Sequence, residues 1–208
     1  TVTDGAGLIA TSTQTVTVVD NQNPTIDTLT AINVNSDAGV CTYVSSQLTA
    51  PTADDNCSVA SVVATPSSLS LGSNTVTWTV TDGAGLIATS TQTVTVEDNE
   101  DPVISCVGDT TKSTDAGDCT YTVQGTEFDA TFTDNCTDGS ITNNLNGNAS
   151  ILGAVLPKGD TSVIWTVDDG NGQTTNCTTV ITVIDNEDPV AIAQNVIVQL
   201  DASGNGTT

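Results

Sequence analysis

The sequence repeats one acidic stretch whose carboxylates could bind a cation. Asp98-Asn99-Glu100-Asp101-Pro102 recurs as Asp185-Asn186-Glu187-Asp188-Pro189, and a weaker copy, Asp20-Asn21-Gln22-Asn23-Pro24, precedes both. Each copy follows a run of Thr and Val that is typical of a β-strand. We interpret the stretch as the junction between successive β-modules. The simpler interpretation is that it only forms a turn and that the proline begins the next strand.

The charge balance of the 208-residue chain is strongly acidic. The 25 Asp and Glu residues stand against two basic residues, Lys112 and Lys158, and the net charge is −23. Because binding to phosphates depends on Lys and Arg, this balance argues against a nucleic-acid partner. It also argues against docking on anionic membranes, and no apolar run is long enough to insert into a bilayer. The acids could hold cations, or they could simply be solvated and keep a β-rich protein dispersed.

Internal repeats define the expected architecture. Residues 1–18 reappear without change at 79–96, and a diverged copy follows at 166–183, so the spacings are 78 and 87 residues. Such spacings exceed the roughly 20–50 residues of solenoid units and fit small β-sandwich modules. We therefore predict an all-β chain of tandem immunoglobulin-like β-sandwich modules arranged as an elongated rod, cut from a longer protein. Its predicted parts are the C-terminal strands of a preceding module (1–20), two complete modules (21–98 and 99–185) and the N-terminal part of a following module (186–208).

Alternating residues predict the strands of the first complete module. Val76, Trp78 and Val80 alternate with threonines, which indicates a strand with one buried face. The same pattern surrounds Trp165 in the second module, so core packing is favoured over sugar stacking for both tryptophans. In the second module the segment 140–157 is longer, and we expect an extended loop or an extra hairpin there. The strands predicted for the first complete module are 24–33, 41–48, 58–65, 75–81 and 86–97, and a further short strand with a glycine turn is predicted within 66–74.

The six cysteines fall into two kinds when the repeats are aligned. Four occupy matching positions in both modules, whereas Cys106 and Cys177 align with Thr28 and Ser90. Cysteines that are absent together are expected to be bonded together, although spacing alone does not establish connectivity. The pairing we predict is Cys41–Cys57, Cys119–Cys136 and Cys106–Cys177. Three disulfides indicate an extracellular or cell-surface protein, and the alternative of a metal–thiolate site is disfavoured because His and the CxxC spacing are both missing.

Several acidic loops are expected to meet at each junction. Alternate loops of a β-sandwich gather at opposite poles, so linker acids should meet a turn of one module and two loops of the next. Carboxylates this close repel one another, and a hard cation with about six to eight oxygen ligands relieves that repulsion. We therefore predict Ca²⁺ at the module junctions, where it would also stiffen the hinge. The candidate ligands are Asp20, Asn21, Asn23, Asp37, Asp54, Asp55, Asn56, Asp82, Asp98, Asn99, Glu100, Asp101, Asp115, Asp134, Asn135, Asp169, Asp185, Asn186, Glu187 and Asp188.

Two runs of sequence resemble a known repeat family. The run 156–172, LPKGDTSVIWTVDDGNG, resembles the closing signature of hyalin-repeat (HYR) domains, and 71–82, LGSNTVTWTVTD, resembles it without the leading proline. The resemblance implies immunoglobulin-type sandwiches that occur in tandem in extracellular adhesion proteins. The nearly identical repeats look most like the repeat regions of giant Bacteroidota surface adhesins, such as the flavobacterial gliding adhesin. The acidic linker is also similar to the calcium-binding linkers between cadherin modules, although its spacing differs.

These observations predict a non-enzymatic repeat segment of an extracellular adhesin or surface filament, which serves adhesion or gliding at the cell surface. The expected partners are neighbouring modules of the same long chain, other copies in a filament, and a surface polysaccharide or protein ligand. A glycan-binding module array is the alternative, but few aromatic residues are free for stacking. An enzyme would have to act through Asp pairs alone, as in glycoside hydrolysis, whereas acids that recur at every junction favour an architectural role.

Overall fold

The computed structural model describes residues 1–136 and 139–206, which form two compact units. Unit 1 contains Thr1–Val103 together with two later loops, Thr133–Gly139 and Asp168–Thr174. Unit 2 contains Ile104–Phe132, Ser140–Val167 and Thr175–Thr208. The described part of the chain is all-β except for one 3-10 turn, η1 (Ser45–Gln47), so the predicted fold class is confirmed. Among the described residues, no helix is long and apolar enough to cross a membrane.

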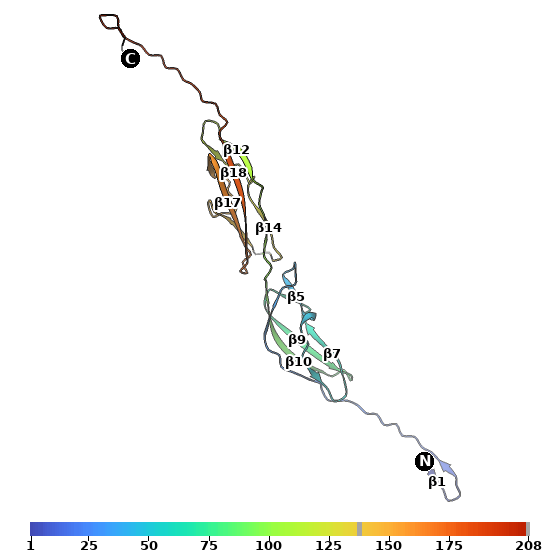
Figure 1. Ribbon diagram of the computed structural model, residues 1–208. Helices are drawn as coiled ribbons and strands as arrows, with labels where there is room; N and C mark the ends of the chain where they lie inside the picture. The colour runs from blue at the N-terminus through green and yellow to red at the C-terminus, as the bar shows by residue number, and fades with distance from the viewer. Residues whose placement is uncertain (137–138, 207–208) are drawn as a thin grey trace. The chain divides into compact units, whose positions relative to one another are not determined.

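A four-stranded sheet forms the centre of unit 1, in the order β4-β10-β9-β7 (Figure 1). The long strands β9 and β10 form an antiparallel hairpin, and the short strand β4 pairs with β10 in parallel. Two smaller ladders, β3-β6 and β5-β8, complete the sandwich. The bounds are β3 Thr25–Ile26, β4 Ile32–Asn35, β5 Thr42–Val44, β6 Ala53–Asp54, β7 Val59–Thr65, β8 Ser68–Ser70, β9 Gly72–Asp82 and β10 Ile87–Glu97.

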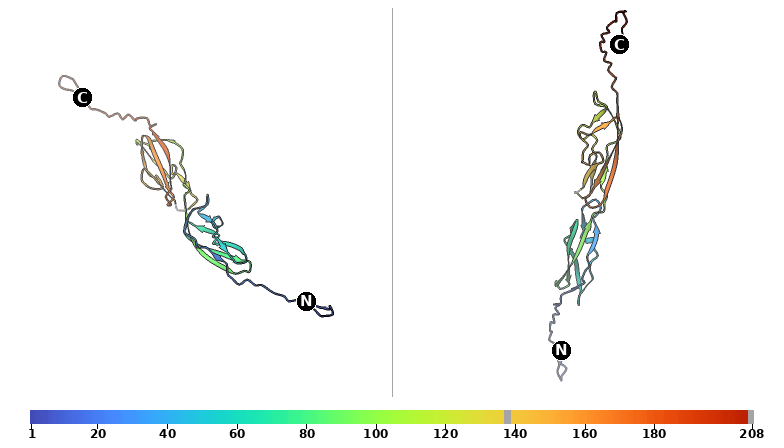
Figure 2. Two further views of the ribbon diagram at one scale, coloured as in Figure 1. Left: turned by 60° about the horizontal axis from the view of Figure 1, so that its bottom comes forward. Right: turned by 90° about the vertical axis from the view of Figure 1, so that its left-hand side faces the viewer.

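A second set of strands repeats the same arrangement. Its four-stranded sheet has the order β12-β18-β17-β15, with β12 parallel to β18, and its small ladders are β11-β14 and β13-β16. Figure 2 shows the strands of each unit from two further sides. The bounds are β11 Val103–Ser105, β12 Thr110–Ser113, β13 Thr120–Thr122, β14 Thr131–Thr133, β15 Ser140–Asn143, β16 Val155–Pro157, β17 Gly159–Asp168 and β18 Thr174–Ile184.

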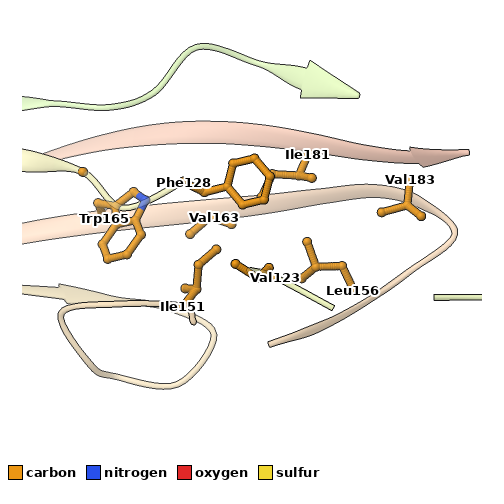
Figure 3. Packing of buried hydrophobic residues seen from close by; sticks show 9 residues of the cluster. Val123, Phe128, Ile151, Leu156, Val163, Trp165, Ile181 and Val183 are labelled. Atoms are coloured by element: carbon orange, nitrogen blue, oxygen red, sulfur yellow. The ribbon is translucent and has the colours of Figure 1, made fainter. Parts of the chain in front are cut away.

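Each unit has its own apolar core, built from the inward faces of its long strands. In unit 1 the alternation in β9 buries Val76 and Trp78 against Val94 and Val96 of β10. In unit 2, Trp165 is fully buried, and the inward side chains converge as Figure 3 shows. Both tryptophans therefore belong to the cores, as predicted. The labelled members of the unit 2 core are Val123, Phe128, Ile151, Leu156, Val163, Trp165, Ile181 and Val183.

Two expected details differ in the structure, and a third, left open between a loop and a hairpin, is decided in favour of the loop. The predicted strand 24–33 is divided between β3 and β4, which pair with different partners. The predicted strand 41–48 ends early, because η1 follows β5 directly. The segment 140–157 contains a loop and not an extra hairpin, since β15 pairs with β17 and β16 pairs with β13. Asn143 organises this loop by accepting hydrogen bonds from the amides of Leu145 and Asn146.

A buried glutamine supports the tryptophan of unit 1. The indole Nε1 of Trp78 donates to Gln92 Oε1 at 3.1 Å, and Gln92 Nε2 donates to the carbonyl of Thr30 at 3.1 Å. The equivalent residue of the second repeat is Thr179, and Nε1 of Trp165 is buried there with no partner among the described residues. The glutamine thus provides the acceptor for the buried indole N–H of Trp78 and is itself held by the partly buried bond to Thr30.

Replacing Gln92 by leucine is expected to destabilise unit 1 by about 1–3 kcal/mol, because it leaves the buried indole N–H of Trp78 without an acceptor. Urea denaturation followed by Trp78 fluorescence measures the loss. Thr91→Ser, an exposed change on the same strand, serves as the control and is expected to stay within about 0.5 kcal/mol of the wild type. An equally small effect of Gln92→Leu would show that the glutamine is only a filler of space.

Candidate metal sites

The disulfides connect the cysteines differently from the predicted pattern. Cys106 is bonded to Cys177, as predicted. The predicted pairings Cys41–Cys57 and Cys119–Cys136 are wrong: Cys41 is bonded to Cys136, and Cys57 and Cys119 are exposed free thiols. The alignment of repeats could not distinguish these patterns, because a bond within each repeat and a bond between successive repeats use the same recurring cysteines.

The loop that carries Cys136 lies in a group of polar residues in unit 1, which we call the Asp98 cluster. It consists of Asp98, Asp134 and Asn135, together with Asp169 and Gln173 of one turn, which is joined to Asp98 by the Gln173 side chain. The carboxylates of Asp98 and Asp134 and the sulfur of Cys136 each place an atom within 4.8 Å of the others. Asn135 Nδ2 donates to Asp98 Oδ1 at 3.0 Å, and Gln173 Nε2 donates to the Asp98 carbonyl at 3.1 Å. Because Cys136 is held in a disulfide, the cluster offers oxygen ligands only.

Each aspartate of the Asp98 cluster uses one carboxylate oxygen to shape its own loop. Asp98 Oδ1 accepts the amide of Glu100, and Asp134 Oδ2 accepts the amide of Cys136. Asp169 Oδ1 accepts three successive amides, those of residues 171, 172 and 173, at 2.8–2.9 Å. Such local bonds from Asp to the backbone explain why this residue type occurs in these turns. They also fix the direction of the second oxygen.

The second oxygen has no partner in any of the three aspartates. Asp98 Oδ2, Asp134 Oδ1 and Asp169 Oδ2 are buried without a hydrogen bond, and so are Asn135 Oδ1 and Gln173 Oε1. The residues are well shielded, since Asp98 is only 4% exposed and Asp169 is 0% exposed. Five buried acceptor oxygens without a donor are the opposite of what folded proteins normally contain. Leaving ionised carboxylates buried and unpaired is costly.

A second group repeats this arrangement near the start of the first repeat. This Asp20 cluster contains Asp20, Asp55 and Asp82, which align with Asp98, Asp134 and Asp169. Asp20 Oδ1 accepts the amide of Gln22, Asp55 Oδ2 accepts the amides of residues 57 and 58, and Asp82 Oδ1 accepts those of residues 84 and 86. The second oxygens, Asp20 Oδ2, Asp55 Oδ1 and Asp82 Oδ2, are again buried without a partner.

The thiol of Cys57 reports the combined charge of the Asp20 cluster. Desolvation, followed by the negative charges of Asp20, Asp55 and Asp82, raises the pKa of Cys57 above its ordinary value. The sulfur also lies within 4.8 Å of Asp20 and Asp55 carboxylate oxygens. Because the thiolate is the form that binds metals, a raised pKa makes this sulfur a weaker ligand than the carboxylate oxygens beside it. The oxygens are therefore the donors that the cluster offers.

The donor sets fit a hard cation. Carboxylate and amide oxygens are the ligands that Ca²⁺ takes, with about six to eight of them at 2.3–2.6 Å, and waters complete a partial set. The Asp98 cluster offers five unpartnered oxygens, so waters or bidentate carboxylates would fill the remaining coordination positions. The Asp20 cluster offers three unpartnered carboxylate oxygens, so more positions would be filled by water. A zinc site is not supported, because structural zinc favours Cys and His ligands. The residues present in both clusters thus suit calcium.

Gln173 is a member of the Asp98 cluster that was not among the predicted ligands. In the aligned first repeat this position is Leu86, so the repeat gave no signal for it. The structure also leaves some predicted ligands out of the clusters. Asp37 already uses both oxygens, which accept from the amide of Val44 and from Nε2 of Gln47. Asp115 accepts the amide of Thr122 in the same way.

The remaining predicted ligands lie on exposed parts of the linkers and loops, and several have other partners. Glu100 and Glu187 accept the amides of Gly39 and Gly117, and Asp185 pairs with Lys158 at 3.5 Å. Asn99 and Asn186 donate to side chains of β4 and β12. Thirteen predicted ligands contribute no buried, unpartnered oxygen to the Asp98 or Asp20 cluster. They are Asn21, Asn23, Asp37, Asp54, Asn56, Asn99, Glu100, Asp101, Asp115, Asp185, Asn186, Glu187 and Asp188.

A separate charged group lies in unit 2. The ammonium of Lys112 and the hydroxyl of Tyr121 both donate to the carboxylate of Glu127. These bonds, Lys112 first and Tyr121 second, lower the pKa of Glu127 below its ordinary value. Desolvation and the bond to Glu127 raise the pKa of Tyr121. The Glu127 carboxylate is paired with both donors, so we assign this group a role in stability.

Acidification is expected to weaken unit 2 through Glu127. Its pKa is lower in the folded than in the unfolded state, so its contribution is complete above the ordinary glutamate pKa of about 4.3 and is lost as the pH falls through the folded value. Glu127→Gln removes this pH-dependent part. Urea denaturation between neutral and acidic pH, followed by Trp165 fluorescence, should show a shallower acid slope for Glu127→Gln than for wild type. Asp118→Asn, an exposed change, is the control; equal slopes in all three proteins would contradict the assignment.

Comparison with known proteins gives structural likeness only. No family model matches the sequence, and no curated protein matches it. Similar solved structures include PcdhgB3 EC1-4, which is 12% identical with a TM-score of 0.40 over 79% of this chain and 50% of that chain. Human protocadherin-24 EC1-2 is 16% identical, with a TM-score of 0.37 over 80% and 100% of the two chains.

Drosophila N-cadherin EC1-4 is 9% identical, with a TM-score of 0.38 over 78% of this chain and 50% of that chain. The chain thus spans about half the length of two of these three structures. Likeness at this level does not extend to function.

Proposed function

We propose that this chain is a non-enzymatic, calcium-binding repeat segment of an extracellular adhesion protein. The observation that carries the proposal is the set of buried, unpartnered oxygens in the Asp98 and Asp20 clusters. In every aspartate of both clusters one oxygen binds the backbone, and the other accepts nothing. The same pairing of one backbone-bonded oxygen with one unpartnered oxygen recurs in two repeats whose sequences differ. This is expected if the unpartnered oxygens bind a ligand and the aspartates do more than form turns.

In this proposal Ca²⁺ is held by Asp98, Asp134, Asn135, Asp169 and Gln173 in one cluster and by Asp20, Asp55 and Asp82 in the other. The ion compensates the buried negative charge and fixes segments that are distant in sequence. Those segments are the linker, the Asp-Asn-Cys loop and the Asp-Gly turn of each repeat. Fixing them together stiffens the hinge between successive modules and gives the array the character of a rod.

The extracellular setting is supported by three features of the chain. Two disulfides indicate an oxidising compartment. The strongly acidic sequence keeps an exposed array soluble, and millimolar calcium outside cells suits sites of modest affinity. The HYR-like signature is in keeping with a surface adhesin built from tandem modules of one chain, with a polysaccharide or protein as its ligand.

Thermal unfolding and small-angle scattering with Ca²⁺ and with chelator test this function together. We expect calcium to raise the melting temperature and to narrow the distribution of overall dimensions, with Mg²⁺ far less effective because it demands octahedral geometry and gives up its waters reluctantly. Identical melting and scattering in both conditions would contradict a calcium-stiffened stalk. If calcium raises the melting temperature but leaves the scattering unchanged, the result would support the calcium site and contradict its role in stiffening the hinge.

A further inference from the structure

The two exposed thiols align with the two cysteines of an observed disulfide. The free thiols are those of Cys57 and Cys119. Cys119 occupies the position of Cys41, and Cys57 occupies that of Cys136. The Cys41–Cys136 bond joins a residue of the first repeat to a residue of the second, 95 positions later. The two thiols are thus complementary halves of the same kind of bond.

The turn before Cys119 reproduces the turn before Cys41. Before Cys41, the amide of Asp37 donates to the Thr42 carbonyl at 2.7 Å, and the amide of Gly39 donates to Glu100 at 2.8 Å. This glycine has a positive φ of 74°, and its equivalent, Gly117, has 76°. The matching contacts before Cys119 are Asp115 to the Thr120 carbonyl at 2.7 Å and Gly117 to Glu187 at 2.7 Å.

The loop that carries Cys57 reproduces the loop that carries Cys136. The amide of Cys136 donates to Asp134 Oδ2 at 2.9 Å, and Asn135 Nδ2 lies 3.7 Å from the Cys136 sulfur. In the first repeat the amide of Cys57 donates to Asp55 Oδ2 at 2.9 Å, and Asn56 Nδ2 lies 3.6 Å from the Cys57 sulfur. Both free cysteines therefore lie in local structure that makes the same hydrogen bonds as their bonded counterparts.

The two free halves differ from the bonded pair in exposure. Cys136 is 3% exposed, whereas Cys57 and Cys119 are both open to solvent. An oxidising compartment does not favour exposed thiols, and an exposed cysteine left over in an extracellular protein indicates pairing with another chain or another module. Each free cysteine is therefore more exposed than its bonded counterpart, since Cys41 is half-buried and Cys136 is buried.

We propose that Cys119 and Cys57 each form a disulfide with the complementary cysteine of another repeat of this type, so that consecutive repeats are covalently stapled head to tail. Cys119 takes the cysteine of an Asp-Asn-Cys loop, and Cys57 takes the cysteine of an Asp-Ala-Gly-x-Cys turn. A second copy of this chain carries both complements. The inference does not depend on calcium binding, because it rests on the repeat of the Cys41–Cys136 geometry.

Bond formation requires an oxidant, and a small-molecule or protein disulfide supplies it. The thiolate of one cysteine attacks this disulfide, and a mixed disulfide forms while one thiol leaves. The second cysteine then attacks the mixed disulfide and releases the other thiol. Two protein thiols lose two electrons and two protons, and the oxidant becomes two thiols. The product is one Cys57–Cys119 bond between two repeats.

Oxidation of the whole chain with glutathione disulfide tests the proposal, with products separated on non-reducing gels and linked peptides identified by mass spectrometry. Wild type is expected to form a ladder of disulfide-linked multimers. Cys57→Ser and Cys119→Ser are each expected to remain almost entirely monomeric, and an equal mixture of the two is expected to form one crossed dimer. That dimer should contain the linked peptide Cys57–Cys119, and both exposed positions tolerate serine without affecting a core.

Random oxidation of surface thiols predicts a different result. Each single variant would then dimerise with itself, and crossed dimers would make up only half of the dimers in the mixture. The proposal would be overturned if self-dimers of Cys57→Ser and of Cys119→Ser made up about half of the dimers in the mixture. So would a wild-type monomer whose Cys57 is bonded to its own Cys119, or a wild type that forms no linked species while its two thiols stay reactive toward an alkylating reagent.

Discussion

Replacing Asp169 by asparagine is expected to stabilise the protein in chelator and to destabilise it in calcium. Asparagine keeps an oxygen that can accept the three amides now bound by Asp169 Oδ1. It replaces the buried, unpartnered Oδ2 with an amide group that carries no charge. Without metal, the substitution removes repulsion from the other carboxylates of the Asp98 cluster. With metal, it removes a ligand.

The size of the calcium effect follows from mass action. If the affinity is about 10⁻⁴ M, as in extracellular modules, about 10 mM Ca²⁺ is a hundredfold excess and stabilises the native state by about 2.7 kcal/mol. Asp169→Asn is expected to lose most of this gain. Melting curves of the wild type and Asp169→Asn, each with Ca²⁺ and with chelator, measure this change. The variant should melt higher than the wild type in chelator and lower than the wild type in calcium.

The neighbouring residue provides a matched control for Asp169→Asn. Asp168→Asn changes the charge by the same amount, but Asp168 is exposed and its Oδ1 accepts only the amide of Gly170. The control should therefore keep the full response to calcium. If Asp169→Asn lowers stability equally in calcium and in chelator, the carboxylate serves only its turn, and the Asp98 cluster is not a metal site.

The second large effect concerns the Cys106–Cys177 disulfide, whose removal is expected to cost unit 2 about 4 kcal/mol. The bond closes a loop of 71 residues, and the chain-entropy model gives a cost of this size for such a loop. The first repeat provides the natural substitutes, since Thr28 and Ser90 occupy the equivalent positions. Cys106→Thr combined with Cys177→Ser is therefore the least disruptive way to remove the bond.

This loss would be a large part of the 5–15 kcal/mol that stabilises a typical domain. Denaturant unfolding followed by fluorine NMR of the fluorotryptophan-labelled chain measures it, because Trp165 and Trp78 give separate resonances and the Trp78 signal of unit 1 serves as the internal reference. Only the Trp165 transition should move. A loss below about 1 kcal/mol would show that the entropic argument does not describe this bond, and an equal shift of both transitions would show that the units do not unfold separately.

The sequence predicted the long strands well because their burial pattern is local. Val76, Trp78 and Val80 alternate with threonines, and β9 buries that face as expected. Val94 and Val96 of β10 are buried in the same alternating way. The short strands β3, β4 and β5 were harder to predict, because their bounds depend on which strands they pair with.

The candidate site was predictable where the repeat aligned the acids and unpredictable where geometry decides. Asp98, Asp134 and Asp169 recur with their equivalents in the first repeat, so sandwich topology alone suggested that they meet. Asp37 recurs in the same way, yet its oxygens are used within its own turn. Sequence does not reveal which oxygen of a turn aspartate remains free, and a glutamine such as Gln173 carries no recognisable signal.

Direct titration of Ca²⁺ into the chelator-treated chain, by isothermal calorimetry at physiological salt, tests the central claim most directly. We predict saturable binding at two sites, with the Asp98 cluster tighter because it offers five unpartnered oxygens and the Asp20 cluster three. Asp169→Asn should remove the tighter site, and Asp82→Asn should remove the weaker one. Absence of saturable binding up to millimolar calcium, or binding that both variants retain, would contradict the assignment of these oxygens to a metal.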